Sequence, residues 1–230
     1  LDCENHGTVA AKRQNVGGIA GWQMLGLVKN ALNTGAVDAA EAEYAGGVSG
    51  LSTGYIRNAY AKCYISGKTN VGGIAGSATV VTDSLSQVSI ENAREKQGAI
   101  LGTEQTTDRE AEDPIKGNYY LQVVDDMGAI DGISYSGMAE PMEQADFLKL
   151  EQLPAAFKTV TVRFLFEDGK SKELVLAPGD DLPMEKIPAV PEKAGCSGTW
   201  EGLKEAELTD ILFGMTFKTC YRSHHAVIES

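Results

Sequence analysis

The chain has 230 residues, 43% of them hydrophobic and 23% charged, a composition typical of a soluble globular protein with one or two domains. Its formal net charge of −12, with no basic stripe, would repel phosphate backbones and argues against nucleic acid as a partner. No run of about 20 apolar residues is present, so no membrane-spanning helix and no membrane insertion are expected.

The start of the chain and its cysteines give little information on location. The chain begins at Leu1, inside what reads as a repeat, which predicts an excised or processed fragment; missing targeting signals are then uninformative. The four cysteines, Cys3, Cys63, Cys196 and Cys220, show no CxxC spacing, so a zinc site is not indicated. Whether Cys196 and Cys220 pair stays open at this point.

A glycine motif recurs through the first half of the chain. It reads VGGIAG at residues 16–21, AGGVSG at 45–50 and VGGIAG at 71–76, with a weaker copy, QGAILG, at 97–102. Its first glycines are 29, 26 and 26 residues apart. A fixed period of this size predicts a stacked repeat architecture. The repeat glycines are Gly17, Gly18, Gly21, Gly46, Gly47, Gly50, Gly72, Gly73, Gly76, Gly98 and Gly102.

A second motif alternates with the first and has the pattern of a β-strand. Its copies are NALNTGAV at residues 30–37, NAYAKCYI at 58–65 and DSLSQVSI at 83–90, and NHGTV at 5–9 is the end of an earlier copy. Apolar residues fall at every second place, which predicts strands stacked about 4.8 Å apart in a parallel ladder. The residues expected to share one interior are Ile19, Val37, Val48, Ile56, Ile65 and Ile74.

The glycines favour a β-solenoid over other repeat folds. A leucine-rich pattern is absent, and several glycines in each unit argue against helical repeats. Glycine suits the corners of stacked coils because it permits close approach and positive φ, and Gly73 is expected to meet both demands. The sequence therefore predicts a mainly β fold that begins with a short right-handed parallel β-solenoid over residues 1–115.

These glycine–hydrophobic–glycine units resemble the GLUG motif, which occurs in tandem in large secreted and surface proteins of bacteria. The resemblance covers about residues 1–105 and rests on three good copies and one poor copy. GLUG arrays occur in adhesins and in surface peptidases, outside the catalytic part. The resemblance thus implies an architecture at the cell surface more than an activity.

Residues 116–157 are expected to cap the array and link it to a second domain. Residues 103–115 are rich in charge and predict a loop, and residues 117–121 (GNYYL) have the form of a closing segment. A cap is needed because the last coil would otherwise expose its cross-section and a strand edge. Residues 143–153 show helical spacing of apolar side chains and end before Pro154, so they predict a helix.

From residue 158 the pattern changes to that of a second, smaller domain. Residues 160–166 alternate as a strand, an Asp-Gly turn follows at 167–170, and residues 173–176 return as a second strand. A proline-spaced crossover then leads to residues 198–202 and to a last strand at 215–221. Trp200 is predicted to be the main aromatic of this core, packed with Phe164, Phe166 and Phe217.

This order resembles the small β-grasp repeats of the internalin B-repeat and Listeria–Bacteroides repeat type. Gly195, Trp200 and Tyr221 match that pattern, whereas Cys196 replaces its usual aromatic residue. The resemblance covers residues 158–222 and implies an α+β or all-β module that spaces and presents other domains. Residues 223–230 have the form of a tail or the start of a further linker.

Several motifs of catalytic or metal sites occur in incomplete form. Residues 50–54 match G-x-S-x-G, but no helix is predicted after them, and residues 67–69 (GKT) lack the earlier glycine of a phosphate-binding loop. His224 and His225 could pair on a metal, and Asp125, Asp126 and Asp131 could bind calcium; solvated residues are the preferred interpretation of both groups. Asp180 and Asp181 have the same interpretation. No catalytic residue, cofactor site or metal site is therefore predicted.

Trp22 is the one candidate binding residue. It follows a repeat glycine, so it either packs on a neighbouring coil or is exposed for a sugar or a partner. The sequence leads to the hypothesis of a non-enzymatic, adhesin-like stalk segment of an extracellular surface protein. The alternative is an accessory, glycan-binding region of a surface hydrolase or peptidase whose catalytic domain lies elsewhere. The expected partners are a host glycan, a host protein or other domains of the same chain.

Overall fold

The computed structural model is mainly β, with 53% of residues in strands and 5% in helices, as the sequence predicted. Contacts divide the chain into two compact units, Leu1–Pro154 and Ala155–Ser230. No helix among the described residues is long and apolar enough to cross a bilayer. The structure describes residues 1–12, 14–105, 114–123, 127–133, 136–204, 206 and 208–223.

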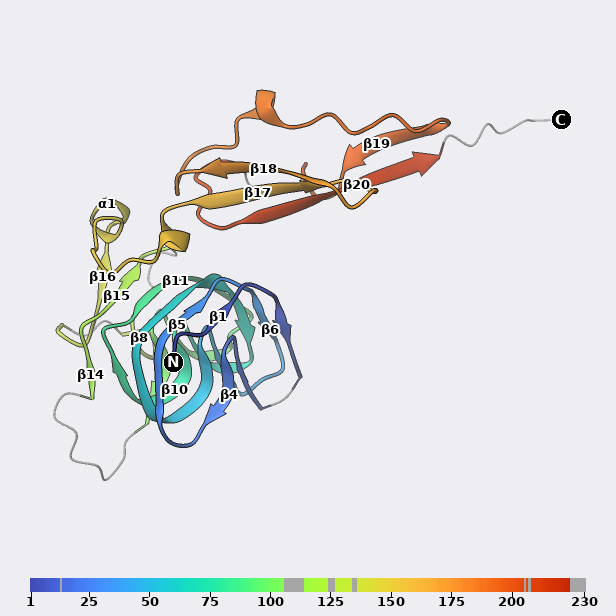
Figure 1. Ribbon diagram of the computed structural model, residues 1–230. Helices are drawn as coiled ribbons and strands as arrows, with labels where there is room; N and C mark the ends of the chain where they lie inside the picture. Colours follow the sequence, from blue (N-terminus) through green and yellow to red (C-terminus); the bar gives the residue numbers. More distant parts are fainter. Residues whose placement is uncertain are drawn as a thin grey trace. The chain divides into compact units, whose positions relative to one another are not determined.

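The first unit contains a β-solenoid of about four turns, which confirms the main expectation from the repeat (Figure 1). Each coil passes through two or more strands that pair in parallel with neighbouring coils. No α-helix occurs among the described residues before 105. The strands of this unit are β1 Glu4–Asn5, β2 Val9–Ala10, β3 Asn15–Gly17, β4 Ala20–Gln23, β5 Leu27–Asn33, β6 Val37–Ala39, β7 Tyr44–Gly46, β8 Ser49–Gly67, β9 Thr69–Gly72, β10 Ala75–Thr82, β11 Leu85–Glu91, β12 Glu95–Gly98, β13 Leu101–Glu104, β14 Ile115–Lys116, β15 Asn118–Leu121 and β16 Ala139–Met142.

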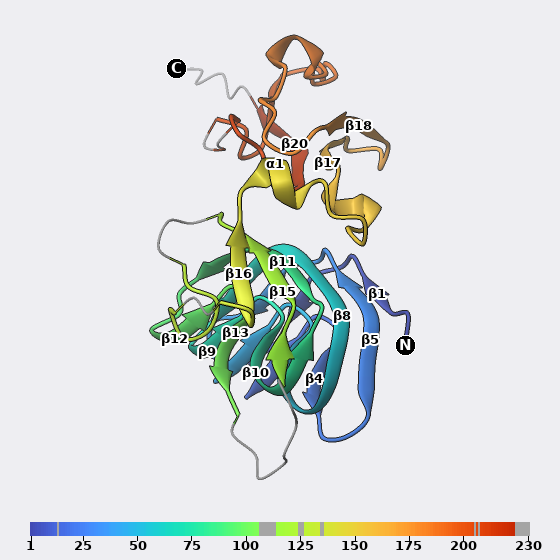
Figure 2. The ribbon, with the colours of Figure 1, turned by 90° about the vertical axis from the view of Figure 1, so that its left-hand side faces the viewer.

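Two parallel sheets form the walls of the solenoid. The smaller has the order β12-β9-β7-β3 and contains the start of each glycine motif. The larger has the path β1-β5-β8-β11-β15-β16, whose strands β5, β8, β11, β15 and β16 lie side by side in Figure 2. Registers follow the repeat, since Val37 pairs with Ile65 and Ile65 with Ile90. The glycine period is therefore the length of one coil.

The interior of the solenoid contains the residues that the alternation predicted. Val37, Val48, Ile56, Ile65 and Ile74 are all at most 1% exposed. Ile19 is only partly buried, although it packs against the same core. Among the described residues, no further coil packs on the other side of β3 and β4, which leaves Ile19 partly exposed.

The repeat glycines are required because backbone atoms of their own or a neighbouring coil lie very close to them, and not because they adopt a positive φ. The expectation of a positive φ at Gly73 is wrong, because no repeat glycine has one. A Cβ atom at Gly73 would instead overlap the carbonyl oxygen of Ala99, in the next coil, and the hydroxyl of Ser86. Gly18 and Gly47 meet a carbonyl oxygen of the next coil in the same way. The first glycine of each motif, at Gly17, Gly46, Gly72 and Gly98, faces backbone of its own coil and of the next.

Asparagine and aspartate form the left-handed corner of each coil. Asp2, Asn30, Asn58 and Asp83 all have φ between 49° and 55°, a region that Asn and Asp tolerate better than most residues. Asn30 Nδ2 donates to Asp2 Oδ1 at 2.8 Å, and Asn58 Nδ2 donates to Asn30 Oδ1 at 3.4 Å. The polar residue that opens the second motif therefore turns the chain and connects neighbouring coils.

The far end of the array is covered by the segment that the sequence assigned to capping. β16 pairs in parallel with β15, and Ile130 forms a bridge with Leu101. The helix predicted over residues 143–153 is shorter than expected, since α1 spans only Gln144–Phe147. Backbone hydrogen bonds from Lys149 to Asp146 and from Leu150 to Phe147 tighten the following turn, so the α-helix does not continue.

The second unit is a four-stranded mixed sheet in the order β18-β17-β20-β19. β17 is antiparallel to β18 and parallel to β20, and β19 is antiparallel to β20. The Asp-Gly turn lies where predicted, with Gly169 at φ +82°. Its elements are η1 Ala155–Phe157, β17 Val160–Leu165, β18 Ser171–Leu176, η2 Met184–Lys186, β19 Cys196–Trp200 and β20 Met215–Ser223.

The predicted aromatic core of the second unit is confirmed. Trp200 is 7% exposed, and its ring lies edge-on to Phe164 and Phe166 with centroids 5.1 and 5.3 Å away. Phe217 stacks on Phe164 at 5.5 Å. Trp200 Nε1 also donates to the Pro188 carbonyl oxygen at 2.8 Å, which holds the proline-rich crossover on the core.

All four cysteines are free thiols. Cys196 lies opposite Ser223 and Cys220 lies opposite Thr199, so these two cysteines are offset by three residues along the paired strands. A disulfide needs Cα atoms within about 7 Å, which this offset does not provide. The question of their pairing is thereby answered.

The buried thiol of Cys63 predicts a loss of stability in alkali. Burial raises its pKa from 9.0 to about 12, against a smaller lowering by the hydrogen bond from Asn33. Above pH 9 only the unfolded chain ionises this thiol, so its contribution to stability is present below pH 9 and declines toward pH 12. Between about pH 8 and about pH 10.5 this amounts to about 2 kcal/mol.

Urea unfolding of the reduced protein at both pH values, with Cys63→Ala beside it, measures this effect. The parent should lose more free energy of unfolding than the variant over that interval. Lys62, whose pKa burial lowers to about 8, acts in the opposite direction in both proteins and cancels from the comparison. Equal losses in the two proteins would contradict the prediction.

Candidate functional site

Exposed apolar side chains gather where β4 turns into β5. Trp22 is 57% exposed, Met24 60% and Leu25 73%, and Leu27 and Tyr55 are also exposed. Tyr55 belongs to this group because its Cα pairs with that of Leu27 on the neighbouring strand. We call Trp22, Met24, Leu25, Leu27 and Tyr55 the Trp22 patch. Of the two interpretations of Trp22 open from the sequence, the structure therefore has the exposed one.

Hydrogen bonds of Gln23, Ser52 and Thr53 fix the turn that carries the patch. Gln23 is 8% exposed, and its Nε2 donates to the carbonyl oxygens of Gly26 and Tyr55 at 3.1 and 3.2 Å. The Ser52 hydroxyl donates to Gln23 Oε1 at 2.9 Å, and the Thr53 hydroxyl donates to the Met24 carbonyl oxygen. The turn is thus held by groups of the next coil, and its apolar side chains are presented in a fixed backbone conformation.

The border of the patch is basic. The guanidinium of Arg57 lies 5.5 Å from the centroid of the Tyr55 ring, a cation–π contact that orients the ring. Leu27 and Tyr55 are followed two residues later by Lys29 and Arg57, which are themselves paired across the two strands. The arrangement is an apolar centre beside two cations in a chain of net charge −12.

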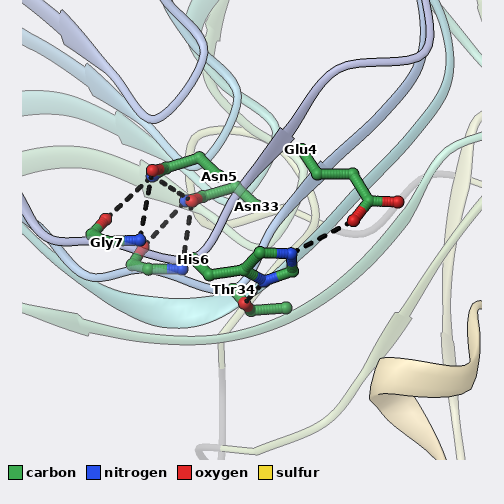
Figure 3. A network of polar contacts seen from close by, with 7 residues as sticks. Glu4, Asn5, His6, Gly7, Asn33 and Thr34 are labelled. Atoms are coloured by element: carbon green, nitrogen blue, oxygen red, sulfur yellow. Dashed lines mark hydrogen bonds and ion pairs between the residues drawn. The ribbon is translucent and has the colours of Figure 1, made fainter.

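A separate cluster of polar side chains joins the first two coils (Figure 3). His6 lies between a hydroxyl and a carboxylate, with Nδ1 2.7 Å from Thr34 Oγ1 and Nε2 3.1 Å from Glu4 Oε2. Beside it, Asn5 Nδ2 donates to Asn33 Oδ1 at 2.8 Å. These contacts connect β1 to the end of β5 and its following turn.

Thr34, His6 and Glu4 are arranged in the order of a nucleophile, a base and an acid that orients the base. Their surroundings, however, suit a structural contact between two coils. The side chains of His6 and Glu4 are 60% and 62% exposed, so water competes for each contact. The nearby N–H groups of Gly7 and Gly35 donate to Asn5 Oδ1 and Asn33 Oδ1 and are not directed at an oxyanion. The sequence did not single out this cluster, because its members are 28 residues apart.

The incomplete motifs have structural roles. Residues 50–54 lie inside β8, with Ser52 fully buried, so they do not form a nucleophile elbow. Lys68 sits between β8 and β9, where its N–H donates to the Ala42 carbonyl oxygen. Asp180 accepts from the Ala177 N–H and Asp181 from the Asp210 N–H, which are contacts of turns. Within the described ranges, no group of three or more metal-ligating side chains is present. Asp125, Asp126, His224 and His225 lie outside the described residues.

The second unit has an open hollow of about 700 Å³ beside its first turn. Its lining includes Phe166, Pro191 and Tyr221. Lys193 Nζ crosses it, 2.7 Å from Glu167 Oε1 and 4.9 Å from the centroid of the Tyr221 ring. Lys193 and Glu167 therefore contact each other in the hollow, and this small domain has a concave surface.

Comparison of the chain with protein-family models, with curated proteins and with solved structures found no match.

Proposed function

We propose that this chain is a non-enzymatic, adhesin-like segment of a large secreted or wall-attached bacterial surface protein. The observation that carries the proposal is the Trp22 patch. Exposing large apolar side chains costs solvation free energy, and contiguous exposed apolar surface commonly marks an interaction site. Hydrogen bonds from Gln23, Ser52 and Thr53 support the turn that exposes it, and the bond between Ser52 and Gln23 is buried. A surface held in this way loses little conformational freedom when a partner binds.

The two units have separate parts in this proposal. We assign the coils to the GLUG type, supported by glycines that admit the carbonyl oxygen of the next coil at Gly18, Gly47 and Gly73. We assign the second unit to the β-grasp-like modules, supported by its mixed sheet and by Trp200 at its centre. The array presents the patch, and the second unit acts as a spacer toward other domains at the extracellular surface.

A protein partner fits the patch better than a glycan. Met24, Leu25 and Leu27 outnumber its two aromatic residues, and aliphatic side chains offer no stacking platform for a sugar ring. A glycan site would also need several convergent polar groups beside its aromatics. The two neighbouring cations, Lys29 and Arg57, suit an acidic rim on the partner.

Adhesion to host cells tests the proposal. Fluorescent beads coated with the chain should bind cultured epithelial cells. A Trp22→Ser, Leu25→Ser variant should lose most of this binding, because large apolar side chains that become buried when a partner binds contribute much of the binding free energy. Tyr64→Ser is the matched control, since Tyr64 is 41% exposed on β8 but outside the patch. Equal binding by the patch variant and the parent would contradict the proposal.

The alternative function, a glycan-binding accessory region of a surface hydrolase or peptidase, predicts different results. Binding that survives protease treatment of the cells and reappears on a glycan array would favour it. Turnover of a polysaccharide or peptide panel by the chain itself would overturn the non-enzymatic assignment if one carboxylate substitution or His6→Ala abolished it. We expect no turnover by the parent or by His6→Ala.

A further inference from the structure

The open hollow of the second unit has a fixed aromatic floor. The ring of Phe166 packs edge-to-face with that of Trp200, with centroids 5.3 Å apart, so it belongs to the core as well as to the hollow. The Tyr221 hydroxyl donates to the Pro191 carbonyl oxygen at 3.0 Å. A Cβ atom at Gly198, opposite Tyr221 on β19, would lie 3.0 Å from its Cε1 atom, so the glycine makes room for the ring. The floor is therefore formed before any ligand binds.

A cation already occupies this floor. Lys193 Nζ lies 4.9 Å from the centroid of the Tyr221 ring and donates to both carboxylate oxygens of Glu167, at 2.7 and 3.0 Å. The hydrogen bond to Glu167 is the largest cause of a rise in the pKa of Lys193 above its usual value. An aromatic face beside a carboxylate is an arrangement that recognises an ammonium or guanidinium group. The contacts of Lys193 thus show which charge the hollow accepts.

The contact that Lys193 makes is one that a ligand can replace. The side chains of Lys193 and Glu167 are 47% and 60% exposed, and exposed ion pairs add little stability because water competes for both partners. Lys193 lies in the proline-spaced crossover between η2 and β19, outside any strand or helix. Its side chain can therefore turn away from the hollow without disturbing the sheet.

The size and charge of the hollow suit a larger cation than the resident ammonium group. Its volume of about 700 Å³ lies within the range of small-ligand sites. Three carboxylates and two ammonium groups line it, a net charge of −1 that becomes −2 when Lys193 turns away. Lys170 is paired with Asp168 at 2.8 Å, whereas Glu192 has no ion-pair partner among the described residues. The charged residues of the lining are Glu167, Asp168, Lys170, Glu192 and Lys193.

We propose that this hollow binds an arginine side chain of a protein partner, which takes the place of the Lys193 ammonium group. A guanidinium is planar, so it stacks on the Tyr221 ring while two of its N–H groups donate to Glu167. Lys193 is then a built-in competitor that the partner displaces. The site lies wholly within the second unit, so the inference goes beyond the Trp22 patch and does not depend on it. The second unit thereby has a binding role of its own beside that of a spacer.

Titration of the isotope-labelled full chain with the peptide acetyl-Gly-Arg-Gly-amide, followed by NMR, tests the proposal. The amide signals of Glu167, Lys193 and Tyr221 should shift in a saturable manner, while those of β16 in the first unit should not. A peptide with citrulline in place of arginine should give no saturable shift, because its side chain has a similar shape but no charge. A peptide with lysine in that place should bind more weakly, because an ammonium group does not stack on the ring.

Substitutions in the full chain separate a built site from general attraction to an acidic surface. Glu167→Gln should weaken binding of the arginine peptide at least about fivefold, because it removes the carboxylate of the pair. Lys193→Met should instead tighten binding about two- to fivefold, because the competitor is gone. Lys172→Met is the matched control, since it removes the same charge from an exposed position on β18 outside the hollow. It should change binding by less than about 1.5-fold.

Circular dichroism of each variant checks that it folds. The absence of a saturable shift in both the parent and Lys193→Met overturns the proposal, as does equal binding of the arginine and citrulline peptides. Equal tightening by Lys193→Met and Lys172→Met would attribute the effect to net charge and overturn the role of Lys193 as a competitor. A lysine peptide that binds as tightly as the arginine peptide overturns the choice of a guanidinium.

Discussion

Replacing Gly73 by valine is expected to lower the free energy of unfolding of the solenoid by about 2 to 4 kcal/mol. The added Cβ atom would overlap the carbonyl oxygen of Ala99, a backbone group of the next coil that cannot rotate away. It would also overlap the hydroxyl of Ser86, which is fully buried. The overlap could be relieved only if neighbouring coils moved apart. Their spacing is fixed by the parallel hydrogen bonds of β9, which ends at Gly72 and pairs with β7 of the preceding coil and β12 of the next.

Thermal and urea unfolding followed by circular dichroism would measure this effect. Gly73→Ala should already be strongly destabilising, because the clash begins at the first added carbon. Gly7→Ala is the matched control in the same array, since a Cβ atom there would have only Asn5 Oδ1 nearby, at 3.8 Å. If both alanine variants unfold like the parent, the coils are not in close contact at Gly73.

The same glycine shows where reasoning from the sequence succeeded and where it did not. The period of Gly17, Gly46 and Gly72 correctly predicted stacked parallel coils, because several glycines in each unit argue against helical repeats and a leucine-rich pattern is absent. The reason given for Gly73 was only half correct. The left-handed corners belong to Asn30 and Asn58, which the sequence pattern presented only as markers of the second motif. The spacing of the glycines alone does not show whether a glycine is needed for a positive φ or for close contact with the next coil.

Long-range geometry limited the prediction of the candidate site. The exposure of Trp22 depends on whether another coil lies against β4, and none of the described strands other than β8 pairs with it. A repeating pattern does not show this. The hydrogen bonds that fix the Trp22 turn join Gln23 to Ser52 and Tyr55, about one coil away in the chain. The second unit was easier to predict, because its strands alternate and are separated by clear turn residues.

The second large effect is expected at Trp200, where substitution by alanine should cost roughly 3 to 5 kcal/mol and unfold the second unit. The indole is 7% exposed and contacts Phe164 and Phe166 on one side of the sheet. Its removal leaves a cavity and an unpaired Pro188 carbonyl oxygen. The cluster around Trp200 is small, and a domain of this size has only a few kcal/mol of stability.

The two tryptophans of the chain allow the units to be followed separately. In Trp200→Ala, the remaining Trp22 reports on the solenoid, and amide exchange in β17 and β20 reports on the second unit. Exchange should accelerate in those strands while the solenoid still unfolds cooperatively. Trp22→Ala is the control, because removing an exposed side chain should change stability by less than about 0.5 kcal/mol. Protected amides in β17 of Trp200→Ala near the parent's unfolding temperature would show that Phe164, Phe166 and Phe217 maintain the core without the indole.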